Sequence, residues 1–373
     1  MKLTAQIKLQ PTSEQDAALA RTLRAANAAC DHISAVAWNT RTFGKFALQK
    51  LCYQDVRDQF GLSAQMTVRA LARVGDAYKL DKKAQRTFRP LASIAYDDRI
   101  LSFNLNSSSV SLWTFDGRQT LPFICGERQR AMLATRQGES DLLFHRGVWY
   151  LLVTCEVQEL PPQDVDDVLG IDLGVTNIAT DSDGTIYTGS TVKGVRYRHR
   201  RGRNKLQRKG TLSTKRCLRK LLGQEARFVR GVNHTISKRI VSAAEHTNRA
   251  LALEDLKGIR TRTRAGRQQR TVLHSWSFFQ LRFFLAYKAQ RAGIPVVAVD
   301  PRNTSRTCPA CGHIAKANRA NQACFKCVQC GCAGHADTIA AGNIRVLGRA
   351  AVIQPYVSDG EAMPLAPETS RRL

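Results

Sequence analysis

Two short cysteine motifs constrain the fold of this chain more than any other feature. Each has the form C-x-x-C-G, with Cys308 and Cys311 in the first and Cys327 and Cys330 in the second. A C-x-x-C turn directs two sulfurs toward one centre, and the following glycine allows the backbone to turn its amides toward the thiolates. Two such turns supply the tetrahedral four-sulfur site that zinc prefers. We therefore predict one structural Zn²⁺, with an iron site as the alternative.

Two neighbouring cysteines complicate the choice of ligands. Cys324 lies three residues before Cys327, and Cys332 follows the second motif. We assign the pairs that a glycine follows, so Cys324 and Cys332 are expected to lie outside the set. The chain has eleven cysteines, six of them within 308–332. An odd, clustered set favours a metal site in a reducing cytosol over a disulfide framework.

The charge of the chain points to a polyanionic partner. The formal net charge is +27 over 373 residues, and segment 193–220 contains no acidic residue. An ordinary solvated helix face would mix the two signs, so nucleic acid is the favoured partner. The candidate contacts come from this segment and from a second basic run after Glu254: Arg196, Arg198, Arg200, Arg201, Arg203, Lys205, Arg208, Lys209, Arg262 and Arg264.

The N-terminal half alternates between two kinds of periodicity. Residues 2–9 alternate polar and apolar, which predicts a half-buried strand. Thr12 and Gln15 form a capping box before a helical region, and a period of two returns between 94 and 157. We predict a β-barrel formed by 1–11 and 86–160, with a helical insert at 12–85. The start lacks the apolar core of a secretory signal, and no run of about eighteen apolar residues predicts a membrane span. A cytoplasmic protein is therefore expected.

A linker candidate, Pro161-Pro162, precedes a different pattern. Strands are predicted at 168–172, 175–181 and 185–188, then one long helical stretch at 205–247. Strands at 250–254 and 295–299 flank a helix at 276–292, and a last helix spans 337–347. Three hairpin strands followed by alternating strands and helices indicate an α/β domain with a mixed sheet, over 166–350. The segment 351–373 is predicted to be disordered.

Three carboxylates stand at the ends of these predicted elements. Asp172 and Glu254 each end an apolar strand, and Asp337 opens the last helix. A carboxylate at a buried strand end is costly unless a cation compensates it. Each acid taken singly also fits an ordinary role, as a turn aspartate, a solvated loop acid or a helix N-cap. Together they favour a nuclease that holds two Mg²⁺ ions.

Several motifs resemble one known family. They are Gly170–Asn177, Leu253–Leu256, Thr304–Gly312 and Asp337–Ile344. These segments resemble the transposon-encoded TnpB (OrfB) family, which is related to the type V CRISPR effector nucleases. The resemblance implies a RuvC-like nuclease domain with the RNase H fold and a zinc ribbon inserted at 303–334. It places the family's catalytic acids, which bind Mg²⁺ or Mn²⁺, on Asp172, Glu254 and Asp337.

The resemblance also implies a function. It predicts an RNA-guided endonuclease that cleaves double-stranded DNA beside a short flanking motif. The guide RNA would derive from the transposon end, and the protein would act as a monomer on that RNA. The wedge-like barrel and the helical recognition insert would hold the RNA–DNA duplex. One position departs from the family, because Ile339 stands where an asparagine is usual. Two alternatives remain open: guide-dependent DNA binding without cleavage, and an unguided RNase H-like resolvase or transposase.

Overall fold

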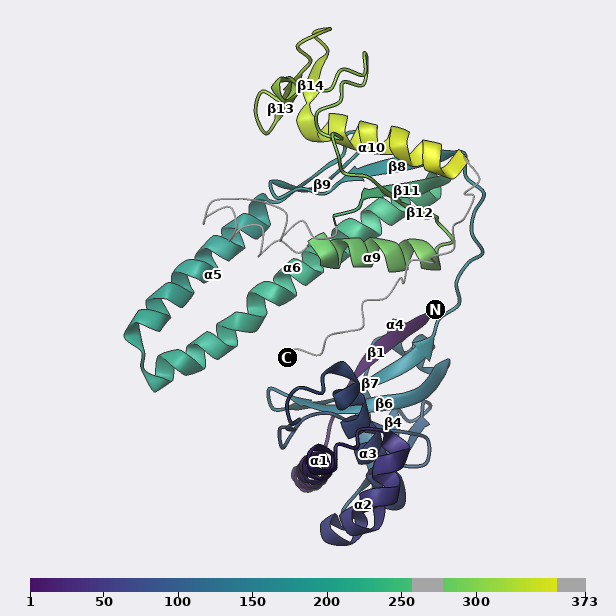
Figure 1. Cartoon of the computed structure of the whole chain (residues 1–373), viewed down its shortest axis with the longest axis vertical. Coiled ribbons are helices and arrows are strands. Elements are labelled where there is room, and N and C mark those ends of the chain that lie inside the picture. The colour runs from purple at the N-terminus through teal and green to yellow at the C-terminus, as the bar shows by residue number, and fades with distance from the viewer. Residues whose placement is uncertain (257–277, 354–373) are drawn as a thin grey trace. The chain divides into compact units, whose positions relative to one another are not determined.

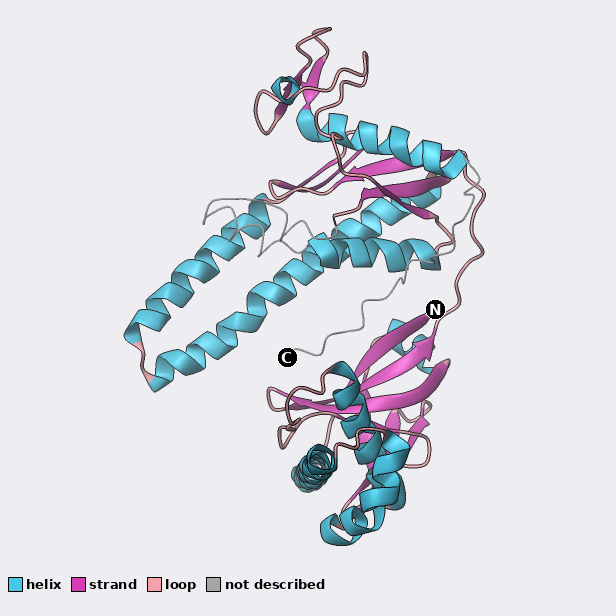
Figure 2. Cartoon of the chain, in the orientation of Figure 1, coloured by secondary structure: helices cyan, strands magenta, loops and turns pink. Residues whose placement is uncertain are grey.

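The computed structural model describes residues 1–256 and 278–353, which form two compact units, Met1–Gln158 and Glu159–Leu373. Each unit has its own hydrophobic core. Figure 1 shows the order of the elements along the chain, and Figure 2 shows the distribution of helix and strand. In the described part of the chain, no helix is both long enough and apolar enough to span a bilayer.

The first unit combines a nearly closed antiparallel sheet with three helices inserted after its first strand. The sheet order is β2-β6-β7-β1-β5-β4-β3. Ala5, Ile7 and Leu9 of β1 face the core, as the alternation predicts. The capping box of Thr12 and Gln15 opens α1. The elements are β1 (Lys2–Leu9), α1 (Ser13–Thr40), α2 (Lys45–Phe60), α3 (Ala64–Leu80), β2 (Ile94–Tyr96), β3 (Leu101–Asn104), β4 (Ser109–Thr114), β5 (Gly117–Ile124), α4 (Glu127–Leu133), β6 (Arg136–His145) and β7 (Val148–Glu156).

The second unit is built on a mixed five-stranded sheet, as predicted. Its order is β10-β9-β8-β11-β12, and the first three strands are antiparallel neighbours. β11 runs parallel to both β8 and β12. The carboxyl ends of β8 and β11 therefore meet at one edge of the sheet. The strands are β8 (Asp167–Asp172), β9 (Asn177–Asp181), β10 (Ile186–Thr188), β11 (Arg249–Glu254) and β12 (Val296–Val299).

Helices cover both faces of this sheet (Figures 1 and 2). On one face, Leu169 and Leu251 share a core with α6 (Leu212–His246) and α9 (Phe278–Arg291). On the other face, Val168 and Ala252 contact Ile344 of α10 (Ala336–Ile353). Because successive residues of a strand point to opposite faces, a central strand covered on both sides is almost wholly apolar. This explains the apolar runs at 168–171 and 250–253.

Two helix boundaries differ from the prediction. The single helical stretch predicted at 205–247 is a helical hairpin, in which α5 (Ser190–Lys209) is separated from α6 by Gly210. Gly210 has a φ of +66°, a conformation that glycine adopts without strain, and the Thr211 side chain caps α6 by accepting the Thr214 N–H. The last helix, α10, continues to Ile353, past its predicted end and into the predicted tail. Residues 354–373 lie outside the described residues.

A small ribbon connects β12 to α10. It contains one 3₁₀ turn (Lys316–Asn318) and the hairpin of β13 (Cys324–Lys326) and β14 (Ala333–His335). Its core consists of Cys308, Phe325, Cys327 and Ala336. The fully buried Asn318 amide ties its loops together by donating to the carbonyl oxygens of Arg306 and His313, at 2.9 and 3.0 Å. Because Ala336 is also the first residue of α10, the ribbon and this helix share one core.

Candidate functional site

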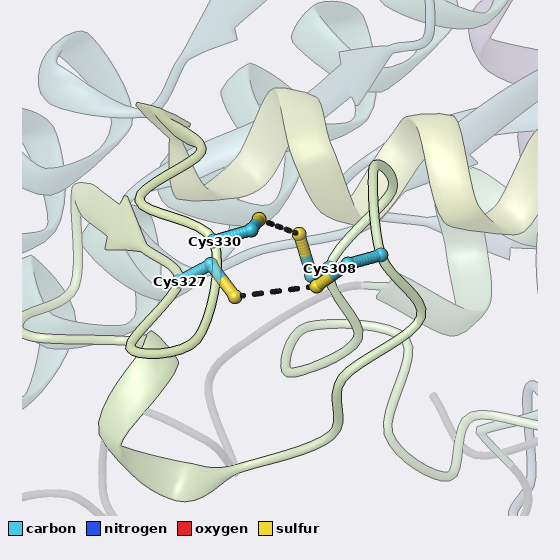
Figure 3. A group of neighbouring side chains, drawn as sticks. Cys308, Cys327 and Cys330 are labelled. Atoms are coloured by element: carbon cyan, nitrogen blue, oxygen red, sulfur yellow. Dashed lines mark hydrogen bonds between the residues drawn. The ribbon is translucent and has the colours of Figure 1, made fainter.

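The four predicted cysteines form one cluster. The sulfurs of Cys308 and Cys330 lie 3.5 Å apart, those of Cys311 and Cys327 lie 3.6 Å apart, and all four fall within 4.8 Å of one another. Figure 3 shows Cys308, Cys327 and Cys330 directed toward a common centre. Four sulfurs at about 2.3 Å from a tetrahedral ion would be separated by about 3.8 Å. The cluster therefore fits a metal such as zinc, and it consists of the four cysteines that a glycine-closed motif predicts.

The knuckle backbones favour the thiolate form of two of these cysteines, Cys308 and Cys327. Burial would raise the pKa of Cys308, but the N–H groups of Cys311 and Ala310 outweigh it and lower that pKa to about 6. The N–H of Cys330 likewise lowers the pKa of Cys327. Thiolates are the form that binds metal. Each turn is closed by a glycine with positive φ, Gly312 at +72° and Gly331 at +76°.

Asp172 and Glu254 occupy the ends of adjacent parallel strands. Ile171 of β8 pairs with Leu253 of β11, so the next residue on each strand is one of these acids. Burial, together with the negative charges of Glu254 and Asp337, raises the pKa of Asp172 to about 7. Burial also raises the pKa of Glu254, against a 2.5 Å hydrogen bond donated by the Thr304 hydroxyl. These carboxylates are close enough to repel one another.

Asp337 reaches the same place from the first turn of α10. Its side chain is nearly buried and accepts two hydrogen bonds, from the Asn177 amide at 2.9 Å and from the Arg319 guanidinium at 3.1 Å. Asn177 begins β9, and Arg319 belongs to the ribbon. The third acid is thus held between the sheet and the ribbon.

Two glycines allow α10 to approach the sheet closely enough for this arrangement. A Cβ on Gly170 of β8 would lie 2.2 Å from the Ala341 carbonyl oxygen of α10. A Cβ on Gly348 of α10 would lie 2.5 Å from the Ala252 Cβ of β11. Real Cβ atoms do not make such short contacts. The helix therefore lies directly on β8 and β11, which brings Asp337 to the ends of both strands.

The three carboxylates form a looser group than the cysteines. Among the described residues, only the cysteine set has three or more ligand atoms within 4.8 Å of one another. Burial is the main cause that raises the pKa values of Asp172 and Glu254, so their ionised forms are incompletely stabilised by the surrounding residues. Carboxylate oxygens are the ligands that Mg²⁺ prefers. The acids therefore fit a site for hard divalent cations that would draw them together.

Comparison with known proteins identifies the family. Residues 152–259 match a family described as a probable transposase (OrfB_IS605), and residues 278–344 match the Cas12f1-like TNB domain. The chain is 30% identical to the TnpB-like protein MJ0751 of Methanocaldococcus jannaschii over 195 residues, which are 49% of this chain and 69% of that protein. The chain belongs to the TnpB (OrfB) family.

Other TnpB relatives support this assignment over part of their length. The chain is 30% identical to the CRISPR-associated endodeoxyribonuclease Cas12f1 of Syntrophomonas palmitatica over 55% of this chain, but it spans only 44% of that protein. It is 29% identical to the putative RNA-guided DNA endonuclease InsQ of Escherichia coli, spanning 55% of it. A Cas12f1–sgRNA–target DNA complex contains a similar fold, with a TM-score of 0.63 at 16% identity over 89% of this chain and 83% of that one.

Four further residues support this TnpB-family site, and the sequence pattern does not indicate their roles. Asn177 and Arg319 bind Asp337, and Thr304 binds Glu254. Asn343 of α10 donates to the Thr304 and Thr307 carbonyl oxygens at 2.7 and 2.8 Å, which fixes the loop that carries the Thr304 hydroxyl. Asn177, Thr304 and Asn343 lie inside the motifs of the resemblance, which is the one hint that could have found them. Arg319 lies in no motif.

Ile339, the position that departs from the family pattern, has a packing role. Its side chain contacts the small core that contains Cys308, Phe325 and Cys327. It also lies where a Cβ on Gly334 would approach within 3.2 Å. Ile339 therefore attaches α10 to the ribbon through apolar contact.

The structure separates the predicted nucleic-acid contacts into groups. Arg196 and Arg203 form ion pairs with Glu225 of α6. The other basic candidates of α5 are exposed: Arg198, Arg200, Arg201, Lys205, Arg208 and Lys209. Arg262 and Arg264 lie outside the described residues. Whether any of these side chains contacts nucleic acid stays a prediction.

Proposed function

We propose that this protein is an RNA-guided DNA endonuclease that cleaves double-stranded DNA with a RuvC-like domain. The observation that carries the proposal is the buried group of Asp172, Glu254 and Asp337, in which burial and then the charges of the other two acids raise the pKa of Asp172. A group of buried carboxylates is costly unless cations compensate its charge, and divalent cations commonly do so at such a site. The strand order, with three antiparallel strands followed by two parallel ones, is the order expected of an RNase H-like sheet.

The chain's own residues would divide the work as follows. Asp172, Glu254 and Asp337 would hold two Mg²⁺ or Mn²⁺ ions, which when bound supply an activated water and stabilise the leaving 3′-oxygen. Thr304 holds the Glu254 carboxylate in one orientation, and Asn177 does the same for Asp337. Arg319 supplies a fixed positive charge beside the acids. The ribbon, with one structural Zn²⁺ on its four cysteines, positions Arg319 and the start of α10.

The partners follow from the family and from the charge. A guide RNA from the transposon end would pair with the target strand, while the protein would read a short flanking motif. The named relatives include RNA-guided DNA endonucleases, and the net charge of +27 suits polyanionic partners. We further propose that the protein acts in the cytosol as a monomer on its RNA.

The test is plasmid cleavage by the protein copurified with a guide RNA from the flanking DNA. Wild type should linearise a matched plasmid in Mg²⁺, and Asp172→Ala should lose cleavage while keeping RNA and target binding. Binding without cleavage by wild type would favour a guide-dependent DNA-binding protein. Cleavage without any RNA would favour an unguided resolvase or transposase. Mg²⁺-dependent cleavage by a clean Asp172→Ala preparation would contradict the assignment of the acids.

A further inference from the structure

The helical hairpin of α5 and α6 projects from the sheet (Figure 1), and α5 is rich in lysine and arginine. One side of α5 faces α6. Val192 and Val195 are buried on this side, and Gly202, Arg203 and Leu206 are half-buried. The spacing of three and four residues is that of a helix seam. The positive charge of α5 is therefore divided between an inner and an outer side.

The inner arginines share one carboxylate within the hairpin. Glu225 of α6 lies 3.6 Å from the Arg196 Nε and 3.1 Å from the Arg203 Nη1. The three side chains retain 20%, 31% and 17% of their exposure for Arg196, Arg203 and Glu225, respectively. Charges held in this way are committed to the register of the two helices. Both guanidinium groups lie on the α6 side of α5, next to Glu225.

The outer side of α5 presents cations on three successive turns. Arg200 and Arg201 occupy one turn, Lys205 the next, and Arg208 and Lys209 the last. With Tyr197 and Asn204 these side chains line a groove of about 640 Å³. α5 contains no acidic residue, so no negative charge from this helix opposes them.

The spacing of these cations suits one strand of nucleic acid lying along the helix. An α-helix rises about 5.4 Å per turn, a step close to that between successive phosphates of a strand. Tyr197, more than half exposed, lies at the end of the groove nearest the sheet, and the Arg200 guanidinium lies 5.9 Å from its ring centroid. An exposed ring beside cations is a platform on which a base can stack.

We infer that the outer face of α5 binds the phosphodiester backbone of a single strand lengthwise, about one phosphate per turn over three turns. Arg196 and Arg203 serve only to hold the hairpin together. The inference deepens the proposed function, because it assigns one surface to a strand of the guide or of the target. Guide RNA and target DNA present the same backbone chemistry, so the experiment uses both.

The experiment measures binding of the full chain to labelled single-stranded RNA and DNA oligonucleotides across a salt series, in EDTA and in the Asp172→Ala background. The variant Arg200→Ala/Lys205→Ala/Arg208→Ala removes one cation per turn. For three phosphates of a single strand, the slope of log K against log salt should become shallower by about 2. Affinity at moderate salt should fall at least about tenfold for RNA, for DNA or for both, and the probe affected identifies the strand.

A matched pair of single variants on the same helix tests the division into two sides. Lys205→Met should reduce the slope by about 0.7. Arg203→Met, two residues away on the inner side, should leave the slope unchanged while lowering the melting temperature. An unchanged slope for both probes in the triple variant, with the helical circular dichroism of wild type, would overturn the inference. Because no cleavage is measured, a wild type that never cleaves would contradict the proposed function and leave this result standing.

Discussion

The cysteine cluster and the carboxylate group lie in one unit but are assembled in opposite ways. The four thiols come from two turns within a ribbon of its own small core, and their sulfurs already have the spacing of a tetrahedral site. The three acids come from β8, β11 and α10 and remain wider apart. Local turn chemistry builds the first site, whereas sheet register and close helix packing build the second. We call the cysteine cluster the closed site and the carboxylate group the open site.

The contrast between the two sites is tested most strongly by removing charge from the open site without changing its shape. Glu254→Gln keeps a partner for the Thr304 hydroxyl but removes one metal ligand. We expect the cleavage rate to fall by about 1,000-fold or more, because metal ions supply several kcal/mol of transition-state stabilisation. The rate is measured with the guide-loaded protein on a matched plasmid.

Thr304→Val is the matched variant for the same contact. It leaves the ligand charge and removes only the hydroxyl that orients it. Loss of such an outer partner costs about 10- to 100-fold in metal affinity or activity. If Thr304→Val were as damaging as Glu254→Gln, the role of Glu254 would be structural rather than that of a ligand.

The closed site should affect the open one through the ribbon. Cys327→Ser removes a buried thiolate and should release the zinc, whose binding free energy in zinc-finger peptides is about 10–16 kcal/mol. The ribbon would then lose its hold on Arg319 and on the first turn of α10. We expect cleavage to fall by about 10- to 100-fold, as for the loss of other outer supports of a metal site. Zinc content and cleavage are measured on the same preparation.

The exposed Cys324 provides the control for this variant. Its side chain lies outside the cluster, so Cys324→Ser should keep both zinc and cleavage. A folded, zinc-free Cys327→Ser protein with full cleavage would show that the two sites are independent.

The same contrast explains how much the sequence could predict. The cysteine ligands followed from spacing and glycine placement alone, because their geometry depends on short turns. The acids could be named from motifs, but Asn177, Thr304, Asn343 and Arg319 could not be assigned a role. Their partners lie between 18 and 160 residues away, and only the folded sheet and ribbon bring them together. Long-range contacts of this kind leave no local pattern.

The elements of secondary structure were likewise predictable where they depend on a local pattern. The mixed sheet was predictable from apolar runs, since a strand covered on both faces must be apolar. The break in the long helical stretch was missed because a single glycine within a helical pattern does not reveal its φ angle. Gly210 ends α5 only because the chain must reverse there to pair its seam with α6.

Disturbing the packing of α10 beside the open site should have a smaller effect on stability, and a second glycine of the same helix provides the control. Gly348→Ala would place a Cβ about 2.5 Å from that of Ala252 and force α10 away from β11. We expect destabilisation by about 1–3 kcal/mol, the usual cost of overpacking. A Cβ on Gly342, in the same helix, would meet no atom of the described residues outside its own helical turns within 4 Å. Gly342→Ala should therefore stabilise the protein by up to about 1 kcal/mol through helix propensity. Denaturant unfolding measures both variants, and equal effects of the two would show that α10 does not need its close approach.

Within the described residues, Arg319 forms an ion pair with Asp337 of the open site. Its removal should have the smallest effect on stability. The guanidinium pairs with Asp337 and lowers the pKa values of Asp172 and Glu254. Arg319 retains 27% of its side-chain exposure, so solvent screens the pair and the cost of breaking it stays well below that of a fully buried one. We expect Arg319→Gln to lower the free energy of unfolding by about 1 kcal/mol in buffer that contains Zn²⁺ but no Mg²⁺. In saturating Mg²⁺ the loss should shrink, because bound ions provide the missing positive charge. Denaturant unfolding in the two conditions measures the difference. An equal loss of unfolding free energy in both conditions would mean that Arg319 stabilises the ribbon alone. Its charge would then not compensate the acids of the open site.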